Sequence, residues 1–158
     1  MTDADKTFMK RAIELAREGV DRNEGGPFGC VIVRDGRIVG EGNNRVTSTN
    51  DPTAHAEIVA IRDACSNLGT FQLDGCIVYT SCEPCPMCLG AIYWSRPVAI
   101  FYGGTREDAA AAGFDDDHFY DELQKPNDQR ELRMVNLLRR EAQDAFAEWT
   151  AKVDKTEY

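Results

Sequence analysis

The sequence has few basic residues and no long apolar run. Its apolar stretches all fall short of the roughly 18 residues that a membrane-spanning helix needs, so no transmembrane segment is expected. Lys and Arg together number 18, against 27 Asp and Glu, and the net charge is −9. A protein that binds long nucleic acid needs a field that attracts phosphate, and no Lys/Arg cluster is visible here. The charge balance therefore favours a small uncharged substrate over tRNA or DNA.

The cysteines and the first ten residues both favour a protein that stays in the cytoplasm. Three of the six cysteines fall close together, at Cys82, Cys85 and Cys88. This crowding favours metal binding in a reducing cytosol over a disulfide framework. Residues 1–10 alternate in charge and lack an apolar core, so no secretory signal is predicted. With 158 residues, 42% of them hydrophobic, we expect one cytoplasmic domain (1–158) with a real core.

Helical and strand-like patterns alternate along most of the chain. Two β-rich runs flank Asp35-Gly36, which is typical of a hairpin turn. In chain order we expect a helix at 8–16 that ends near Gly19, strands at 28–33 and 37–42, a loop at 45–53, a helix at 54–68, a strand at 76–80, a helix at 85–95, a strand at 98–102, short helices at 108–112 and 115–124, a loop at 125–129 and a helix at 139–151. This order predicts an α/β fold with helices on a central sheet.

Three residues of metal-ligand type stand near the predicted helix starts. Cys85 and Cys88 are spaced i and i+3 at the beginning of a helix, which places both sulfurs on one face. His55 belongs to the preceding helix and can supply a third ligand. A catalytic zinc site uses three protein ligands and leaves the fourth position to water, whose pKa the metal lowers to roughly 7. We therefore predict one zinc ion per subunit.

Glu57 lies two residues after His55 and is the predicted proton carrier. On an ideal helix the two side chains point about 200° apart, so both can reach the metal only if the first turn points end-on into the site. A closed Cys₃His structural zinc site that includes Cys82, or part of an iron–sulfur ligand run, would also use these cysteines. Both alternatives leave Glu57 and the prolines Pro84 and Pro86 unexplained.

Longer motifs make the sequence similar to the cytidine/deoxycytidylate deaminase superfamily, and within it to the small bacterial guanine deaminases. The motifs are GGPFG at 25–29, NDPTAHAE at 50–57, TSCEPCPMCLGAIYW at 80–94, AGFDD at 112–116 and the terminal Glu157-Tyr158. The resemblance implies a three-layer α/β/α fold with a mixed five-stranded central sheet.

The resemblance also implies residues that bind a purine base. Asn44 would hydrogen-bond the base, although Asn is also a common turn residue. Phe28 and Trp94 would form apolar walls, although Phe28 is equally compatible with the core. Ala54 would line the pocket. Asp116 would accept hydrogen bonds from the guanine edge, although Asp115 to Asp117 also resemble an N-cap cluster.

The same family pattern implies a homodimer with an exchanged C-terminal segment, at about 140–158. In such an arrangement Tyr158 would close the pocket of the neighbouring subunit. Phe146-x-x-Trp149 and the shared end of the chain carry this part of the likeness. Glu148 in that segment is a candidate second proton shuttle.

The predicted reaction is hydrolytic deamination of guanine to xanthine and ammonia. Water activated by zinc would attack C2, and Glu57 would carry the proton to N3 and then to the leaving nitrogen. Backbone N–H groups around Ala56 and Cys85 would help to hold the attacking oxygen. Other possibilities are a deaminase of cytosine, ammeline or cytidine, a tRNA adenosine deaminase, and a non-catalytic zinc-binding module.

Overall fold

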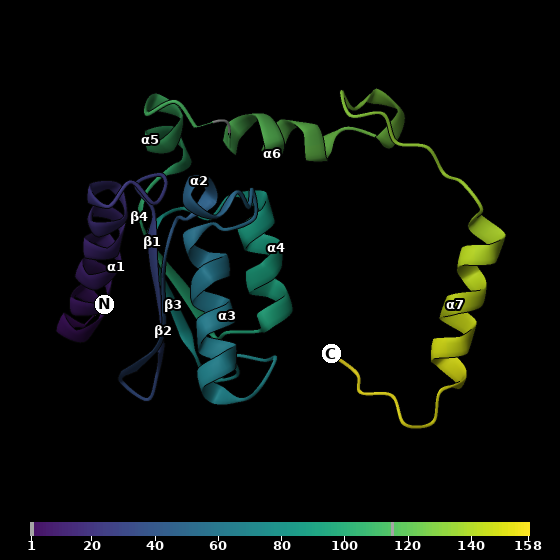
Figure 1. The fold of residues 1–158 in the computed structure, drawn as a ribbon, viewed down its shortest axis with the longest axis horizontal. Helices are drawn as coiled ribbons and strands as arrows, with labels where there is room; N and C mark the ends of the chain where they lie inside the picture. The colour runs from purple at the N-terminus through teal and green to yellow at the C-terminus, as the bar shows by residue number, and fades with distance from the viewer. Residues whose placement is uncertain (1, 115) are drawn as a thin grey trace. The chain divides into compact units, whose positions relative to one another are not determined.

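The computed structural model describes residues 2–114 and 116–158, which form two compact units, Met1–Tyr120 and Asp121–Tyr158. Figure 1 shows the course of the chain. Within these described ranges, no helix combines the length and the apolar character needed to cross a bilayer. In chain order the elements are α1 (Asp3–Asp21), β1 (Gly29–Arg34), β2 (Arg37–Asn43), α2 (Val46–Thr49), α3 (Ala56–Leu68), β3 (Ile77–Cys82), α4 (Pro86–Ser95), β4 (Ala99–Gly104), α5 (Arg106–Ala111), α6 (Asp116–Gln124), the 3₁₀ helix η1 (Asn127–Gln129) and α7 (Arg139–Ala151).

The first unit is built on a mixed sheet with the strand order β2-β1-β3-β4. β1 pairs antiparallel with β2 and with β3, whereas β3 and β4 are parallel. The predicted hairpin is confirmed. Asp35 and Gly36 both have positive φ angles, 51° and 71°, as a type I′ turn requires.

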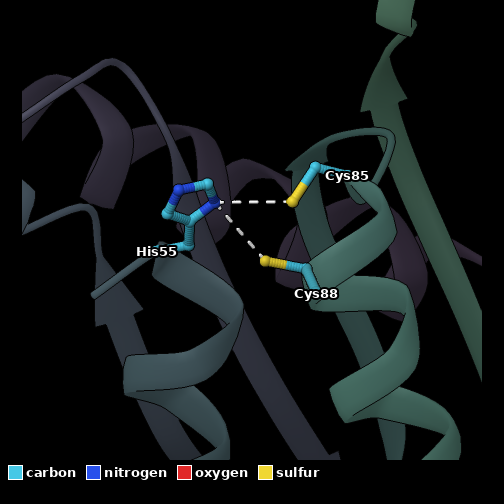
Figure 2. A group of neighbouring side chains, drawn as sticks. All are labelled: His55, Cys85 and Cys88. Carbon is cyan, nitrogen blue, oxygen red and sulfur yellow. Dashed lines mark hydrogen bonds between the residues drawn. The ribbon is translucent and has the colours of Figure 1, made fainter. Parts of the chain in front are cut away.

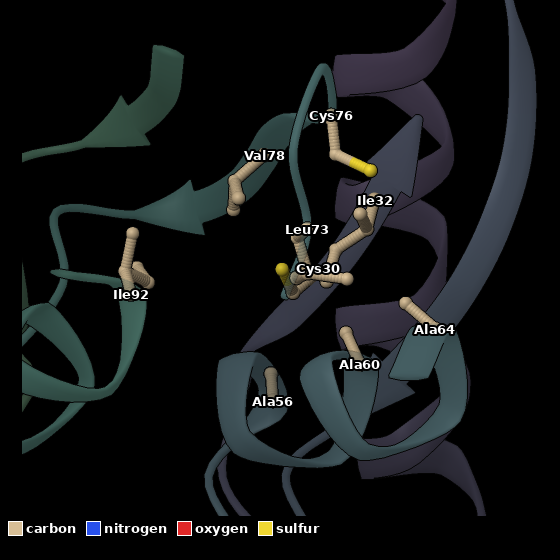
Figure 3. Packing of buried hydrophobic residues seen from close by; sticks show 9 residues of the cluster. All are labelled: Cys30, Ile32, Ala56, Ala60, Ala64, Leu73, Cys76, Val78 and Ile92. Carbon is tan, nitrogen blue, oxygen red and sulfur yellow. The ribbon is translucent and has the colours of Figure 1, made fainter. Parts of the chain in front are cut away.

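Helices cover both faces of this sheet, as the α/β prediction required. In Figure 1, α1 lies on one face and α3 and α4 lie on the other. Side chains of β1 alternate between the two layers, because successive residues of a strand point to opposite faces. Figure 3 shows the α3/α4 side of the core, where Cys30 and Ile32 meet the buried alanines of α3. Val31 and Val33 pack instead against α1, beside Tyr79.

Glycines in β2 allow α3 to lie unusually close to the sheet. A Cβ atom at Gly42 would lie 2.4 Å from the carbonyl oxygen of Ala56, and one at Gly40 would lie 2.6 Å from that of Ala60. Ala56 and Ala60 are fully buried at this contact. Small residues on both sides thus fix the height of α3 above the sheet, and with it the position of the residues at the start of α3.

The predicted five-stranded sheet is wrong, because the described part of the chain forms four strands. After β4 the chain enters α5 at once. Thr105 and Asp108 form a capping box there, which satisfies the free N–H groups at the helix start. In the described residues beyond α5, the regular elements are α-helices and one 3₁₀ helix. The expected loop at 45–53 also contains one short helix, α2.

The second unit, Asp121–Tyr158, holds the end of α6, η1 and α7. The helix expected at 139–151 is confirmed with the same bounds. Between η1 and α7 the chain has no regular element. The exposed large apolar side chains of the second unit are Leu123, Leu132, Met134, Val135, Leu137, Leu138, Phe146, Trp149, Val153 and Tyr158. The unit therefore buries little apolar surface of its own.

Candidate active site

The three predicted metal ligands come together at the start of two helices. His55 is the N-cap residue of α3, and Cys85 is the N-cap residue of α4. Both have extended backbone angles, so their side chains project from the helix end and not from its flank. Pro86 takes the first position of α4, where its missing N–H costs nothing. Cys88 follows one turn into α4 and points back to the same place (Figure 2).

The spacing of the three ligand atoms fits a tetrahedral ion. The Nδ1 atom of His55 lies 3.6 Å from the Cys85 Sγ and 3.5 Å from the Cys88 Sγ. Zinc bonded to nitrogen and sulfur at its usual lengths holds the two donors about 3.6 Å apart at the tetrahedral angle. The donor set and its geometry therefore match zinc. The side chain of Cys82 does not join this group, because its Sγ donates a hydrogen bond to the Thr105 carbonyl at 3.5 Å.

The electrostatics of the two thiols also suit a cation. The pKa of Cys85 is lowered to about 4, because its sulfur accepts a hydrogen bond from Cys88 and lies beside His55. The pKa of Cys88 is raised, because its thiol donates to Cys85 and is buried. The pair thus favours one thiolate and opposes a second. A dication between the sulfurs removes that opposition, since a metal ion favours deprotonated thiols.

Glu57 lies in the first turn of α3 with only 6% of its surface exposed. Its Oε1 accepts a hydrogen bond of 3.0 Å from the hydroxyl of Thr80 on β3. Burial raises the pKa of this carboxyl above its ordinary value. Because His55 is an N-cap and not a helical residue, the angular conflict expected from an ideal helix does not arise. Glu57 and His55 therefore line the same cavity.

That cavity has a volume of about 230 Å³. Pockets for drug-sized ligands usually hold about 300–1,000 Å³, so this one suits a small ring better than a nucleotide. The residues that line it are Gly26, Phe28, Asn44, Val46, Thr47, His55, Glu57, Glu83, Cys85, Phe114 and Asp116. This lining includes three carboxylates and no Lys or Arg, so it disfavours an anionic substrate.

Asn44 is held so that it can donate into the cavity. Its side-chain oxygen accepts hydrogen bonds of 3.2 Å from the backbone N–H groups of Gly26 and Val46. The amide NH₂ group is thereby the part left for a ligand. The segment between α1 and β1 packs tightly against Asn44, so that a Cβ atom at Gly25 would lie 2.2 Å from the side-chain oxygen of Asn44. The absence of a side chain at Gly25 therefore lets the backbone come close enough for the Gly26 N–H to bind Asn44.

Two aromatic rings form an apolar part of the wall. The rings of Phe28 and Phe114 meet edge to face, with their centroids 4.7 Å apart. Phe114 was not singled out from the sequence, although it lies inside the AGFDD motif. Glu83 was also missed, although it stands inside the cysteine motif. Both side chains reach the cavity from loops, where sequence periodicity gives no signal.

The structure brings together six of the ten predicted site residues around the cavity, and Cys88 joins them through the ligand cluster. Ala54 is buried but does not line the cavity, and its carbonyl oxygen accepts a hydrogen bond of 2.9 Å from the Arg45 N–H. Trp94 on α4 is 65% exposed and also does not line it. Tyr158 belongs to the second unit. Asp115, part of the expected N-cap cluster, lies outside the described residues.

Comparison with known proteins gives consistent matches. Residues 2–104 match the family described as the cytidine and deoxycytidylate deaminase zinc-binding region. Guanine deaminase of Bacillus subtilis (strain 168) is 56% identical over 153 residues, which cover 97% of this chain and 98% of that protein. The crystal structure of a Bacillus subtilis guanine deaminase superposes with a TM-score of 0.94, covering 97% of this chain and 98% of that one.

Two further relatives are less similar. A tRNA-specific adenosine deaminase of Agrobacterium fabrum is 45% identical over 96 residues, which cover 61% of this chain and 62% of that protein. A solved structure of guanine deaminase from Nitrosomonas europaea is 35% identical, with a TM-score of 0.66, covering 69% of this chain and 63% of that one. These two matches cover about two thirds of the chain, whereas both matches to the guanine deaminase of Bacillus subtilis cover 97% of it.

Proposed function

The chain belongs to the cytidine and deoxycytidylate deaminase family, and we propose that within it the protein is a zinc-dependent guanine deaminase. The reaction is guanine plus water to xanthine plus ammonia: a C2–O bond forms and the bond from C2 to the exocyclic nitrogen breaks. The observation that carries the proposal is 56% identity to a guanine deaminase along nearly the whole chain. The small cavity beside the three ligands supports it.

The residues proposed to hold the metal are His55, Cys85 and Cys88. A zinc ion bound there would supply a water molecule whose pKa is lowered to roughly 7, and therefore a nucleophile at neutral pH. The N-termini of α3 and α4 both face this place. Their free N–H groups, including those near Ala56, stabilise negative charge that develops on the attacking oxygen.

Glu57 is the proposed proton carrier. The hydroxyl of Thr80 engages one carboxylate oxygen, which fixes the orientation of the group. The carboxylate lines the cavity, so it can take a proton from the attacking water and deliver it to N3 and then to the leaving amine. Burial raises the pKa of Glu57, which makes its carboxylate a better acceptor for the proton of the attacking water in the first step.

Recognition of the base is proposed to depend on complementary hydrogen bonds. The NH₂ group of Asn44 matches an acceptor on the purine, and the carboxylate of Asp116 matches ring N–H groups. Phe28 would flank the flat ring, together with Phe114. Ala54 and Trp94 remain predicted pocket residues on the family resemblance alone.

We further propose a cytoplasmic homodimer in which residues at about 140–158 cross to the neighbouring subunit, with Tyr158 over its cavity. The second unit exposes most of its large apolar residues, and a unit of its size, below roughly 40 residues, rarely stabilises itself. Together with the first unit this tail would complete a single deaminase domain. Glu148, in α7, stays a candidate second proton shuttle.

A mixing experiment tests the exchange of tails. Chains carrying Glu57→Gln keep an intact tail, and chains truncated before Tyr158 keep an intact metal site. If tails are exchanged, unfolding and refolding the two inactive proteins together restores up to one working site per mixed dimer. If each tail serves its own subunit, the mixture stays as inactive as its components.

The substrate proposal is tested by ammonia release from zinc-loaded protein. The panel contains guanine, adenine, cytosine, cytidine, ammeline and a tRNA anticodon stem-loop. We expect guanine to be the preferred substrate. Preference for the stem-loop would instead support a tRNA adenosine deaminase, which the net charge of −9 and the lack of basic residues around the cavity argue against.

A further inference from the structure

Two segments that are distant in the sequence both contribute residues to the wall of the cavity. The first segment, the loop 83–85, follows β3 and ends with the predicted metal ligand Cys85. The second segment, 105–120, carries α5 and the start of α6, and it supplies Phe114 and Asp116 to the cavity. The distance from the metal ligands to the recognition residues therefore depends on how these two segments are joined.

Glu83 joins the first loop to the start of α5. Its backbone N–H donates to the Gly104 carbonyl at 2.9 Å, and its side-chain Oε2 accepts a hydrogen bond of 3.2 Å from the Arg106 N–H. The carboxylate thus satisfies one of the free N–H groups at a helix start. This contact attaches the N-terminal end of the second segment, at the start of α5, to the first segment.

Tyr120 joins the same loop to α6. Its hydroxyl donates to the Pro84 carbonyl at 2.8 Å, and the guanidinium carbon of Arg106 lies 5.2 Å from the centre of its ring. Burial raises the pKa of Tyr120, so its hydroxyl keeps the proton that it donates. Glu83 and Pro84 are neighbours in the chain. The contacts therefore form a closed set that runs from Glu83 to Arg106, from Arg106 to Tyr120 and from Tyr120 back to Pro84.

Asp116 lies about one helical turn from Tyr120, one of the residues in this closed set of contacts. Residues four positions apart on a helix lie on the same face, so Tyr120 and Asp116 share one face of α6. The residue that Tyr120 binds, Pro84, is bonded directly to the metal ligand Cys85. The hydrogen bond from Tyr120 to Pro84 is therefore a short mechanical link between the carboxylate that recognises the base and the metal site.

We propose that Tyr120 is a positioning residue for the reaction, and that Glu83 and Arg106 complete the link that sets Asp116 at the right distance from the metal ligands. The proposal rests on the guanine deaminase activity proposed above. In this proposal the Glu83 carboxylate acts by accepting the hydrogen bond from the Arg106 N–H. The alternative is that the Glu83 carboxylate, which also lines the cavity, binds the substrate through its charge.

The test is a double-mutant cycle between Tyr120→Phe and Asp116→Asn. Tyr120→Phe keeps the aromatic ring beside Arg106 and removes the hydroxyl that donates to the Pro84 carbonyl. We expect it to raise KM for guanine about three- to tenfold, the range typical of one lost hydrogen bond, with kcat changed less. Zinc content should stay at the wild-type value, and Tm should fall by only a few degrees, because a single partly buried hydrogen bond is lost. Tyr102→Phe, at a half-exposed position on β4, is the matched control and should change neither constant.

The cycle separates positioning from a general structural role. If Tyr120 acts through Asp116, adding Tyr120→Phe to Asp116→Asn raises KM no further. An equal rise in both backgrounds overturns the proposal, and so does an unchanged KM in the single variant. If the wild-type protein deaminates another member of the panel and not guanine, the proposed function fails, and the same cycle measured with that substrate still decides the positioning role.

A second pair of variants separates the two tasks of Glu83. Glu83→Gln keeps an oxygen that accepts from the Arg106 N–H but has no charge, whereas Glu83→Ala loses both. Positioning predicts that the glutamine variant keeps KM near the wild-type value and that the alanine variant matches Tyr120→Phe. Equal damage in both variants would mean that the substrate binds the charge, which overturns the assignment of Glu83.

Discussion

Replacing Glu57 by glutamine removes the proposed proton carrier and little else. The two side chains have the same shape, and the glutamine oxygen still accepts the 3.0 Å hydrogen bond from Thr80. Glu57 is 94% buried, and glutamine keeps the bond to Thr80 but replaces the other carboxylate oxygen by an NH₂ group, so the free energy of unfolding should fall by about 1 kcal/mol. Glutamine cannot carry a proton, however, and burial keeps bulk water from taking over that task.

The expected loss of activity follows from these features. One proton-transfer group contributes about 10²–10⁴ to a rate, and Glu57 is proposed to act twice in each turnover. We therefore expect kcat for guanine to fall by about 10⁴, which corresponds to roughly 5 kcal/mol of lost transition-state stabilisation. Thr80→Val, which frees the carboxylate without removing it, should cost only about tenfold.

The assay is ammonia release at saturating guanine, with zinc content and Tm measured on the same samples. Glu57→Gln should bind zinc at the wild-type ratio and unfold at nearly the wild-type temperature. Retention of more than a few per cent of wild-type kcat would refute the proton-carrier role. Loss of zinc together with activity would mean that Glu57 supports the metal site instead. Identical behaviour of both proteins in every assay would favour a non-catalytic zinc-binding module.

Three other changes test the site and its support. Asn44→Asp keeps an oxygen for the two backbone N–H groups but replaces the donor that faces the base, so KM for guanine should rise at least tenfold, with kcat affected less. Cys88→Ser removes a thiolate ligand and should reduce the zinc retained after gel filtration to a small fraction, whereas Cys65→Ser, outside the ligand cluster, should retain it. Gly42→Ala forces a methyl group to 2.4 Å from a carbonyl oxygen of α3, and its free energy of unfolding in urea should fall by about 1–3 kcal/mol. Gly36→Ala has open space but a φ of 71°, and should cost only about 1 kcal/mol.

Features that depend on residues close together in the chain could be predicted from the sequence. Asp35-Gly36 specified the hairpin turn, because only such residues adopt two positive φ angles in succession at low cost. The spacing of Cys85 and Cys88 placed two sulfurs together, because one helical turn joins them. The bounds of α7 followed from a pattern within one segment. Motifs shared with deaminases identified the family without any geometry.

Features that depend on contacts between distant segments could not be predicted in this way. Periodicity counted His55 as a helical residue, but the fold makes it an N-cap, and only this allows Glu57 to share the cavity with it. The expected fifth strand is absent from the described sheet, because pairing at a sheet edge depends on which segment reaches that edge. Glu83 and Phe114 reach the cavity from loops, where no local pattern reports direction. Spacing along the sequence determines which side chains lie within one helical turn of each other. Which loops come into contact depends on how the helices pack on the sheet.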